Sequence, residues 1–166
     1  MTELAQPKNF LDRVAVWCAT YLIFVIIGLA ILLPEFISPL MIGFPILLAW
    51  FVAFILQKLF HRRRPFQNGE RPLIKMLFET PSFPSAHTAI ATSVLPIMVF
   101  GEGRTAVTTV FVLLAAVMAW SRVRVRVHYV SDTIAGALIG AMTGYAAIFL
   151  FASFITWSLG GSIIDN

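Results

Sequence analysis

Charged residues and cysteine are both scarce in this chain of 166 residues. Charged side chains make up 12% of it and hydrophobic side chains 59%, whereas a soluble domain carries about 25% charged residues. A chain with so few charges would expose a largely apolar surface to water, so the composition predicts that lipid surrounds most of it. The single cysteine, Cys18, lies in an apolar run. It excludes a disulfide framework and a cysteine metal site.

Acidic residues are also few, eight against twelve lysines and arginines. No cluster of carboxylates is present to hold a metal ion, so we expect neither a metal nor another cofactor. The basic residues gather in 58–75 and 122–126, which long apolar runs separate. This pattern favours anionic lipid headgroups or phosphate over nucleic acid. Nothing in it indicates an obligate protein partner, and the first apolar run is too long for a cleavable signal peptide.

Five apolar runs are present, at residues 14–33, 36–57, 81–101, 105–121 and 131–157. A membrane-spanning helix needs about 20 apolar residues. Backbone groups in lipid must pair internally, and runs this long favour helices over a closed barrel. We therefore expect an all-α, polytopic bundle of about five transmembrane helices, with residues 1–166 forming a single domain. Gly136, Gly140 and Gly144 recur every four residues in the fifth run, which is typical of close helix packing.

Three polar clusters flank these runs, at residues 58–65, 84–87 and 121–132. With five spans, all three share one membrane face, so one pocket at the interface can draw on all of them. Every lysine and arginine except Arg104 lies on that face. The positive-inside rule would make it the cytoplasmic face. The sidedness stays open, because several of these arginines are also candidates for substrate binding. Arg62 and Arg63 are interpreted as topology and headgroup charges only.

The third cluster carries the strongest chemical pattern. His128 and Asp132 are four residues apart, so on a helix they share one face. The carboxylate can hold one ring nitrogen and leave the other free to attack, as in a catalytic triad. Arg122 and Arg64 suit a phosphate, because a guanidinium donates hydrogen bonds in a planar fork. Together they indicate phosphoryl transfer through a phosphohistidine.

The second cluster begins an apolar run with Pro84-Ser85-Ala86-His87. Amides in the first turn of a helix have no partner within it and favour an anion. We expect Ser85 and the amides that follow to bind phosphate. His87 is positioned to protonate the leaving oxygen and then to activate water.

These three clusters resemble the type 2 phosphatidic acid phosphatase family. It is the membrane branch of a superfamily that includes bacterial acid phosphatases and vanadium haloperoxidases. The family pattern is K-x6-R-P, then P-S-G-H, then S-R-x5-H-x3-D. The third block is matched in full by Ser121, Arg122, His128 and Asp132. In the second block, Ala86 replaces the glycine and still supplies an amide.

The first block departs from the family pattern. Arg64-Pro65 fits, but Gln57 stands seven residues before Arg64 and the lysine is Lys58. A shift of one residue turns a helical side chain by about 100°, for which the long lysine stem can compensate. An alternative register uses Arg71-Pro72, with Arg64 in the place of the lysine. We prefer Arg64-Pro65 with Lys58. The family usually has six spans, which leaves the sidedness of the site open here too.

The resemblance implies a metal-independent phosphatase in a membrane, acting on a lipid phosphate or diphosphate. The substrate is a phospholipid, a prenyl diphosphate or a lipid A type molecule. The resemblance also implies the residues of the site. The catalytic residues would be His128, His87 and Asp132, and the phosphate would be bound by Lys58, Arg64, Ser85, Ala86 and Arg122. We expect a multi-pass protein of the bacterial cytoplasmic membrane, in contact with membrane lipids. The alternatives are a non-catalytic transporter or anionic-lipid-binding protein, and a phosphotransferase using the same site.

Overall fold

The computed structural model describes residues 4–32, 38–76, 80–102 and 105–164, and throughout these residues the regular structure is helical. The helices are α1 (Phe10–Leu32), α2 (Pro39–Phe60), α3 (Ala86–Ser93), α4 (Leu95–Ile97), α5 (Thr105–Arg124) and α6 (Val130–Ile164). A 3₁₀ turn (Pro65–Asn68) follows α2, and a π turn (Met98–Glu102) follows α4. The predicted all-α fold is confirmed.

Within the described residues, four helices are long and apolar enough to cross a membrane: α1, α2, α5 and α6. The third apolar run, at residues 81–101, instead gives a shorter apolar helix, Ala86–Phe100. Its regular α3 portion ends at Ser93, shortly before Pro96. Proline has no N–H and clashes with the preceding turn, so the helix continues only as a short turn and a π turn. The third of the five expected spans is therefore present as a short, broken helix.

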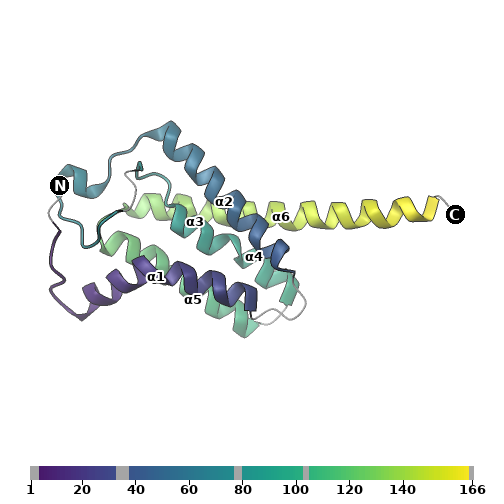
Figure 1. Ribbon diagram of the computed structural model, residues 1–166, viewed down its shortest axis with the longest axis horizontal. Helices are drawn as coiled ribbons and strands as arrows, with labels where there is room; N and C mark the ends of the chain where they lie inside the picture. The colour runs from purple at the N-terminus through teal and green to yellow at the C-terminus, as the bar shows by residue number, and fades with distance from the viewer. Residues whose placement is uncertain (1–3, 33–37, 77–79, 103–104, 165–166) are drawn as a thin grey trace.

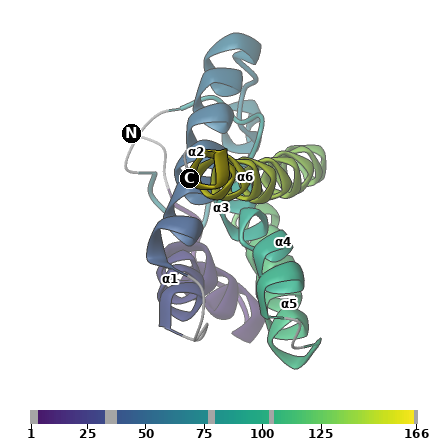
Figure 2. The ribbon, with the colours of Figure 1, turned by 90° about the vertical axis from the view of Figure 1, so that its right-hand side faces the viewer.

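The short helix α3 lies at the centre of the bundle. It packs against α6, α2, α5 and α1, and both ribbon views place it among them (Figure 1 and Figure 2). The approach of α6 is closest, because a Cβ at Gly136 would lie 2.5 Å from the carbonyl oxygen of Ser85. A Cβ at Gly140 would meet the side chain of Thr92. The predicted glycine stripe thus lets the α6 backbone lie directly on α3.

One end of the bundle gathers the segments that carry the polar clusters (Figure 1). The N-terminal segment joins the α2–α3 connection there, through a hydrogen bond of 2.9 Å from the Ala5 amide to the Pro72 carbonyl. The Arg124 guanidinium at the end of α5 pairs with the Asp12 carboxylate of α1 at 2.9 Å. At the opposite end, α6 continues well past the other helices (Figure 1). The segments that carry the three polar clusters therefore lie at one end of the bundle, as the sequence predicts.

Candidate active site

The chain leaves α2 by a turn that points Arg64 inward. His61 ends the helix in the left-handed conformation, with φ 47°. Arg64 follows in extended backbone, and Pro65 begins the next turn with the fixed φ of proline. The Arg64 side chain is buried, with 2% of its surface exposed.

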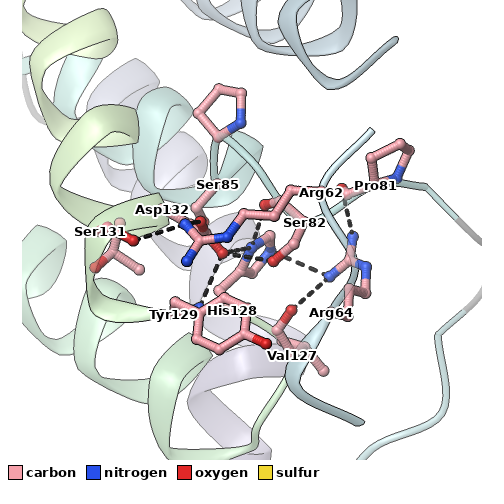
Figure 3. A network of polar contacts seen from close by, with 12 residues as sticks. Arg62, Arg64, Pro81, Ser82, Ser85, Val127, His128, Tyr129, Ser131 and Asp132 are labelled. Carbon is pink, nitrogen blue, oxygen red and sulfur yellow. Dashed lines mark hydrogen bonds and ion pairs between the residues drawn. The ribbon is translucent and has the colours of Figure 1, made fainter. Parts of the chain in front are cut away.

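Backbone carbonyls on two sides hold the Arg64 guanidinium. Its Nη1 donates to the Val127 carbonyl at 2.8 Å and its Nε to the Thr80 carbonyl at 2.7 Å. The same Nη1 lies 3.3 Å from Nε2 of His128 (Figure 3). Arg71, the anchor of the alternative register, is exposed. The burial of Arg64 beside His128 therefore supports the Arg64-Pro65 register.

The α3 helix begins beside Asp132. The Ser85 amide donates to the Asp132 backbone carbonyl at 2.9 Å, so this amide is already occupied. The amides of Ala86 and His87 belong to the first helical turn, where N–H groups have no carbonyl partner in their own helix. The His87 ring is half-buried and lies within electrostatic range of Arg64 and His128. Among the described residues it has no hydrogen-bond partner.

Arg122 lies near the end of α5 and is 2% exposed. Its Nη1 donates to the Ala19 carbonyl of α1 at 3.0 Å. Its Nε is buried and has no hydrogen-bond partner within the described part of the chain. An unsatisfied, buried charged donor costs several times a normal hydrogen bond. A bound anion would satisfy it, and Arg64 and His87 lie close enough to interact with the Arg122 charge.

His128 follows α5 and has 3% of its surface exposed. Its Nδ1 lies 2.7 Å from the Ser82 carbonyl, which can only accept a hydrogen bond. The proton is therefore on Nδ1, and the lone pair of Nε2 points toward Arg64. Burial above all, and then Arg122 and Arg64, lower the pKa of His128 to about 4, although Asp132 opposes them. The imidazole is thus neutral at physiological pH, which a nucleophile needs.

Asp132 does not make the closest contact with Nδ1 of His128. The Oδ2–Nδ1 distance is 3.6 Å, longer than a hydrogen bond. Oδ2 instead accepts from the Ser82 hydroxyl and from the Tyr129 amide. Oδ1 pairs with Nη1 of Arg62 at 2.7 Å (Figure 3). The direct triad-like bond expected from the sequence is replaced by a link through Ser82.

Lys58 does not reach this cluster. It is exposed on α2, with Nζ 5.6 Å from the centre of the Phe54 ring. Gln57, one residue earlier, is 5% exposed and donates from Nε2 to the Pro84 carbonyl at 2.9 Å. The lysine stem thus does not compensate for the one-residue shift. Gln57 occupies the inward-facing position, as its place seven residues before Arg64 could have indicated.

Two further residues of the cluster were not expected from the sequence. Ser82 bonds both His128 and Asp132, yet it lies outside every motif and carries no pattern of its own. Arg62 pairs with Asp132, although the sequence favours a topology and headgroup role for Arg62 and Arg63. That interpretation is wrong for Arg62. Within the described ranges, no three His, Cys, Asp or Glu side chains gather as they would around a metal ion.

A model of the PAP2 superfamily matches residues 25–156 of this chain. The chain belongs to the PAP2 superfamily. The matched range includes all three polar clusters. Together with the long apolar helices, the family makes the chain an integral membrane protein. The family resemblance inferred from the three motifs is confirmed.

Similar proteins agree with the family. The decaprenylphosphoryl-5-phosphoribose phosphatase of Mycobacterium tuberculosis is 34% identical over 131 residues, which are 76% of this chain and 69% of that protein. The crystal structure of Aquifex aeolicus LpxE has a TM-score of 0.64 at 26% identity, covering 86% of this chain and 87% of that one. A PAP2-type phosphatidylglycerolphosphate phosphatase from Bacillus subtilis has a TM-score of 0.69 at 19% identity, covering 89% and 79%. The last comparison supports the fold alone.

Proposed function

We propose that this protein, a single membrane domain, hydrolyses a lipid phosphate or diphosphate through a phosphohistidine. The observation that carries the proposal is the direction of the His128 ring. Its Nδ1 is tied to the Ser82 carbonyl, and its Nε2 lies 3.3 Å from the Arg64 guanidinium. A phosphate bound by Arg64 would therefore meet the nucleophilic lone pair directly.

The first half-reaction transfers the phosphoryl group to the protein. Nε2 of His128 attacks phosphorus in line, a P–N bond forms, and the bond from phosphorus to the lipid oxygen breaks. His87 donates a proton to that oxygen. The resulting phosphoimidazole is positively charged, and the Asp132 carboxylate 3.6 Å from Nδ1 stabilises this charge.

The second half-reaction regenerates His128. His87, now neutral, takes a proton from water, whose oxygen attacks phosphorus while the P–N bond breaks. Inorganic phosphate leaves. Through both halves Arg64, Arg122, the Ser85 hydroxyl and the Ala86 amide bind the phosphate oxygens, since the Ser85 amide is bonded to Asp132. Lys58 is left out of this set because its ammonium lies over the Phe54 ring.

The substrate class follows from the position of the cluster at the ends of membrane helices. A phosphorylated headgroup would enter from the interface, while its acyl or prenyl chain stays in lipid. The similarity to the mycobacterial enzyme supports a prenyl-linked substrate, which places it first among the lipids to be tested. We further propose the bacterial cytoplasmic membrane as its location.

Phosphate release by the purified protein in detergent tests the proposal. The panel contains a prenyl-linked phosphosugar, a prenyl diphosphate, phosphatidylglycerol phosphate and phosphatidic acid. We expect release from at least one of them, unaffected by EDTA, and a loss of at least 10³-fold in His128→Ala. The matched control is His61→Asn, because His61 is exposed and asparagine tolerates its positive φ. Undiminished turnover in His128→Ala would overturn the nucleophile assignment.

The same variant separates the enzyme from a protein that only binds anionic lipid. A binding protein would release no phosphate, and His128→Ala would leave its binding to vesicles that contain an anionic phospholipid unchanged. A phosphotransferase would consume substrate without a matching yield of inorganic phosphate until an acceptor alcohol is removed. Measuring lipid product and phosphate together distinguishes these outcomes.

A further inference from the structure

Arg62 makes the closest ionic contact of the Asp132 carboxylate. Its Nη1 lies 2.7 Å from Oδ1 of Asp132 and 2.7 Å from the hydroxyl oxygen of Ser131. The guanidinium carbon lies 4.3 Å from the centre of the Tyr129 ring, a stacked cation–π contact. Figure 3 shows the Arg62 side chain lying across Asp132 in this way. The guanidinium is therefore held in one place, although 39% of the side chain is exposed.

Arg62 also fixes the segment that bonds to His128. Its backbone carbonyl accepts a hydrogen bond of 2.8 Å from the Ser82 amide. The Ser82 carbonyl in turn accepts the Nδ1 proton of His128 at 2.7 Å, and the Ser82 hydroxyl donates to Asp132. Both ends of Arg62, backbone and side chain, thus act on the relative positions of His128 and Asp132.

The contacts of Asp132 explain why it stays away from the imidazole. Arg62, the Ser82 hydroxyl and the Tyr129 amide each donate to the carboxylate. The Ser82 hydroxyl and the Tyr129 amide occupy Oδ2, the oxygen that lies 3.6 Å from Nδ1 of His128, while Arg62 holds the other oxygen, Oδ1. Of the three donors, only Arg62 brings a full positive charge.

We propose that Arg62 is a positioning residue, whose ion pair with Asp132 holds the carboxylate away from His128 and so keeps the imidazole neutral with its Nε2 lone pair free. The effect of the ion pair on the charge of His128 concerns the protein without substrate. The kinetic consequence rests on the proposed phosphatase function. Arg62 lies two residues before Arg64 and belongs to none of the three motifs.

The charges around His128 set the direction of the expected effect. Arg64 from the loop after α2 and Arg122 from α5 each disfavour a positive charge on the ring, and His87 from α3 also lies within electrostatic range of it. Asp132 from α6 is the one group among those identified that favours the imidazolium. Without Arg62, the Asp132 carboxylate loses its cationic partner, so its charge acts more strongly on the ring and it can close to hydrogen-bond distance from Nδ1. A nearby opposite charge raises the pKa of a histidine by about one unit or more.

Nitrogen NMR of the histidine side chains measures this directly, because the chain has three histidines. His61→Asn and His87→Asn assign the remaining ring. In Arg62→Met, which keeps an unbranched side chain but removes the charge, we expect the pKa of His128 to rise by about one unit. Arg62→Lys retains the charge and should restore most of the original titration. Arg63→Met is the matched control, because Arg63 is exposed on the same segment, and it should change nothing.

A rate measurement adds the consequence for turnover. The acid limb of the pH profile of phosphate release should move upward by the same amount in Arg62→Met, so that the loss of activity grows as pH falls. A role limited to folding would lower the rate equally at every pH. If Arg62→Met does not fold, Arg62→Gln removes the charge and gives the same comparison.

The two measurements separate two failures. An unchanged His128 titration in Arg62→Met, or an equal shift in Arg63→Met, overturns the positioning role and leaves the phosphatase proposal standing. If the His128 titration shifts in Arg62→Met but the wild-type protein releases phosphate from none of the panel lipids, the phosphatase proposal is overturned and the positioning role stands.

Discussion

The side-chain amide of Gln57 donates a hydrogen bond of 2.9 Å to the backbone carbonyl of Pro84, joining α2 to the residue just before the α3 cap. Both groups are buried. The bond therefore fixes the start of α3, and with it the first-turn amides and the His87 ring. Gln57 stands where the family pattern has lysine, so in this chain that position anchors a loop.

Gln57→Leu should destabilise the protein by about 1–3 kcal/mol, because it leaves a buried carbonyl without a donor. It should also lower kcat, since α3 loses its anchor. Thermal unfolding in detergent and phosphate release measure the two effects. Lys58→Ala is the comparison, because the exposed Lys58 side chain makes only a cation–π contact, and it should change stability by less than about 0.5 kcal/mol. A larger loss of activity in Lys58→Ala than in Gln57→Leu would restore lysine as the phosphate ligand.

Ser82→Ala removes the hydroxyl that donates to Asp132 but keeps the carbonyl that accepts from His128. The imidazole tautomer should therefore persist, while Asp132 loses one of its donors. We expect kcat to fall by about fivefold, equivalent to one ordinary hydrogen bond. Asp132→Asn should cost far more, roughly 10²–10⁴-fold, because it removes the charge that stabilises the phosphoimidazole. Equal losses in the two variants would argue that the hydroxyl, and not the carboxylate charge, is what matters.

The pH dependence of kcat/KM should show that the His128 imidazole stays uncharged well below pH 7. Burial first, then Arg122 and Arg64, lower the pKa of this residue to about 4, compared with about 6.5 for a free histidine. The nucleophile is lost when it gains a proton, so the acid limb due to His128 should lie near pH 4. An acid limb near pH 6.5 that persists in variants of both other histidines would contradict the buried, neutral imidazole.

The same pKa predicts a loss of stability in acid. The unfolded chain binds a proton to His128 as pH falls through about 6.5, whereas the folded protein resists protonation down to about 4. The unfolded state is therefore favoured progressively between these values. Unfolding temperatures at pH 7 and pH 4.5 measure the effect, and His128→Asn should show a smaller difference between them.

The glycine stripe gives a prediction about packing. Gly140→Ala would place a Cβ against the Thr92 side chain and the Ala89 carbonyl. Overpacking of this kind costs about 1–3 kcal/mol, and it should separate α6 from α3 and lower activity as well. Gly28→Ala is the matched control, since nothing lies within 4 Å of its Cβ. That change should be neutral or stabilising by about 0.5–1 kcal/mol.

The sequence predicted those parts of the site that depend on fixed helical spacing. Ser121 and Arg122 lie near the end of α5 and Asp132 near the start of α6, and counting spans was enough to bring them near Arg64. The glycine stripe was likewise visible as a four-residue period. In these cases a regular backbone carries the information, whereas His128 lies in the turn before α6 and does not share a helix face with Asp132 as the spacing predicted.

The rest of the cluster depends on irregular backbone, which spacing does not determine. Ser82 reaches His128 and Asp132 because the loop before α3 folds back against the Arg62 carbonyl. Arg62 could not be told from Arg63 in a basic run, although one is paired and the other exposed. The broken third span arises from Pro96 in a run whose hydropathy alone indicated a full crossing.

The length of α6 constrains how the protein sits in a bilayer. At 1.5 Å per residue, its 35 residues extend about 52 Å, while the hydrocarbon layer is about 30 Å thick. Asp132, two residues from the start of this helix, belongs to the end where a phosphorylated headgroup would enter. With that end held at one interface, the helix must lean steeply or emerge into water beyond the opposite leaflet. The helix that carries Asp132 therefore also indicates the tilt of the molecule in the bilayer. The membrane depth of a spin label near the C-terminal end of α6 would measure that tilt.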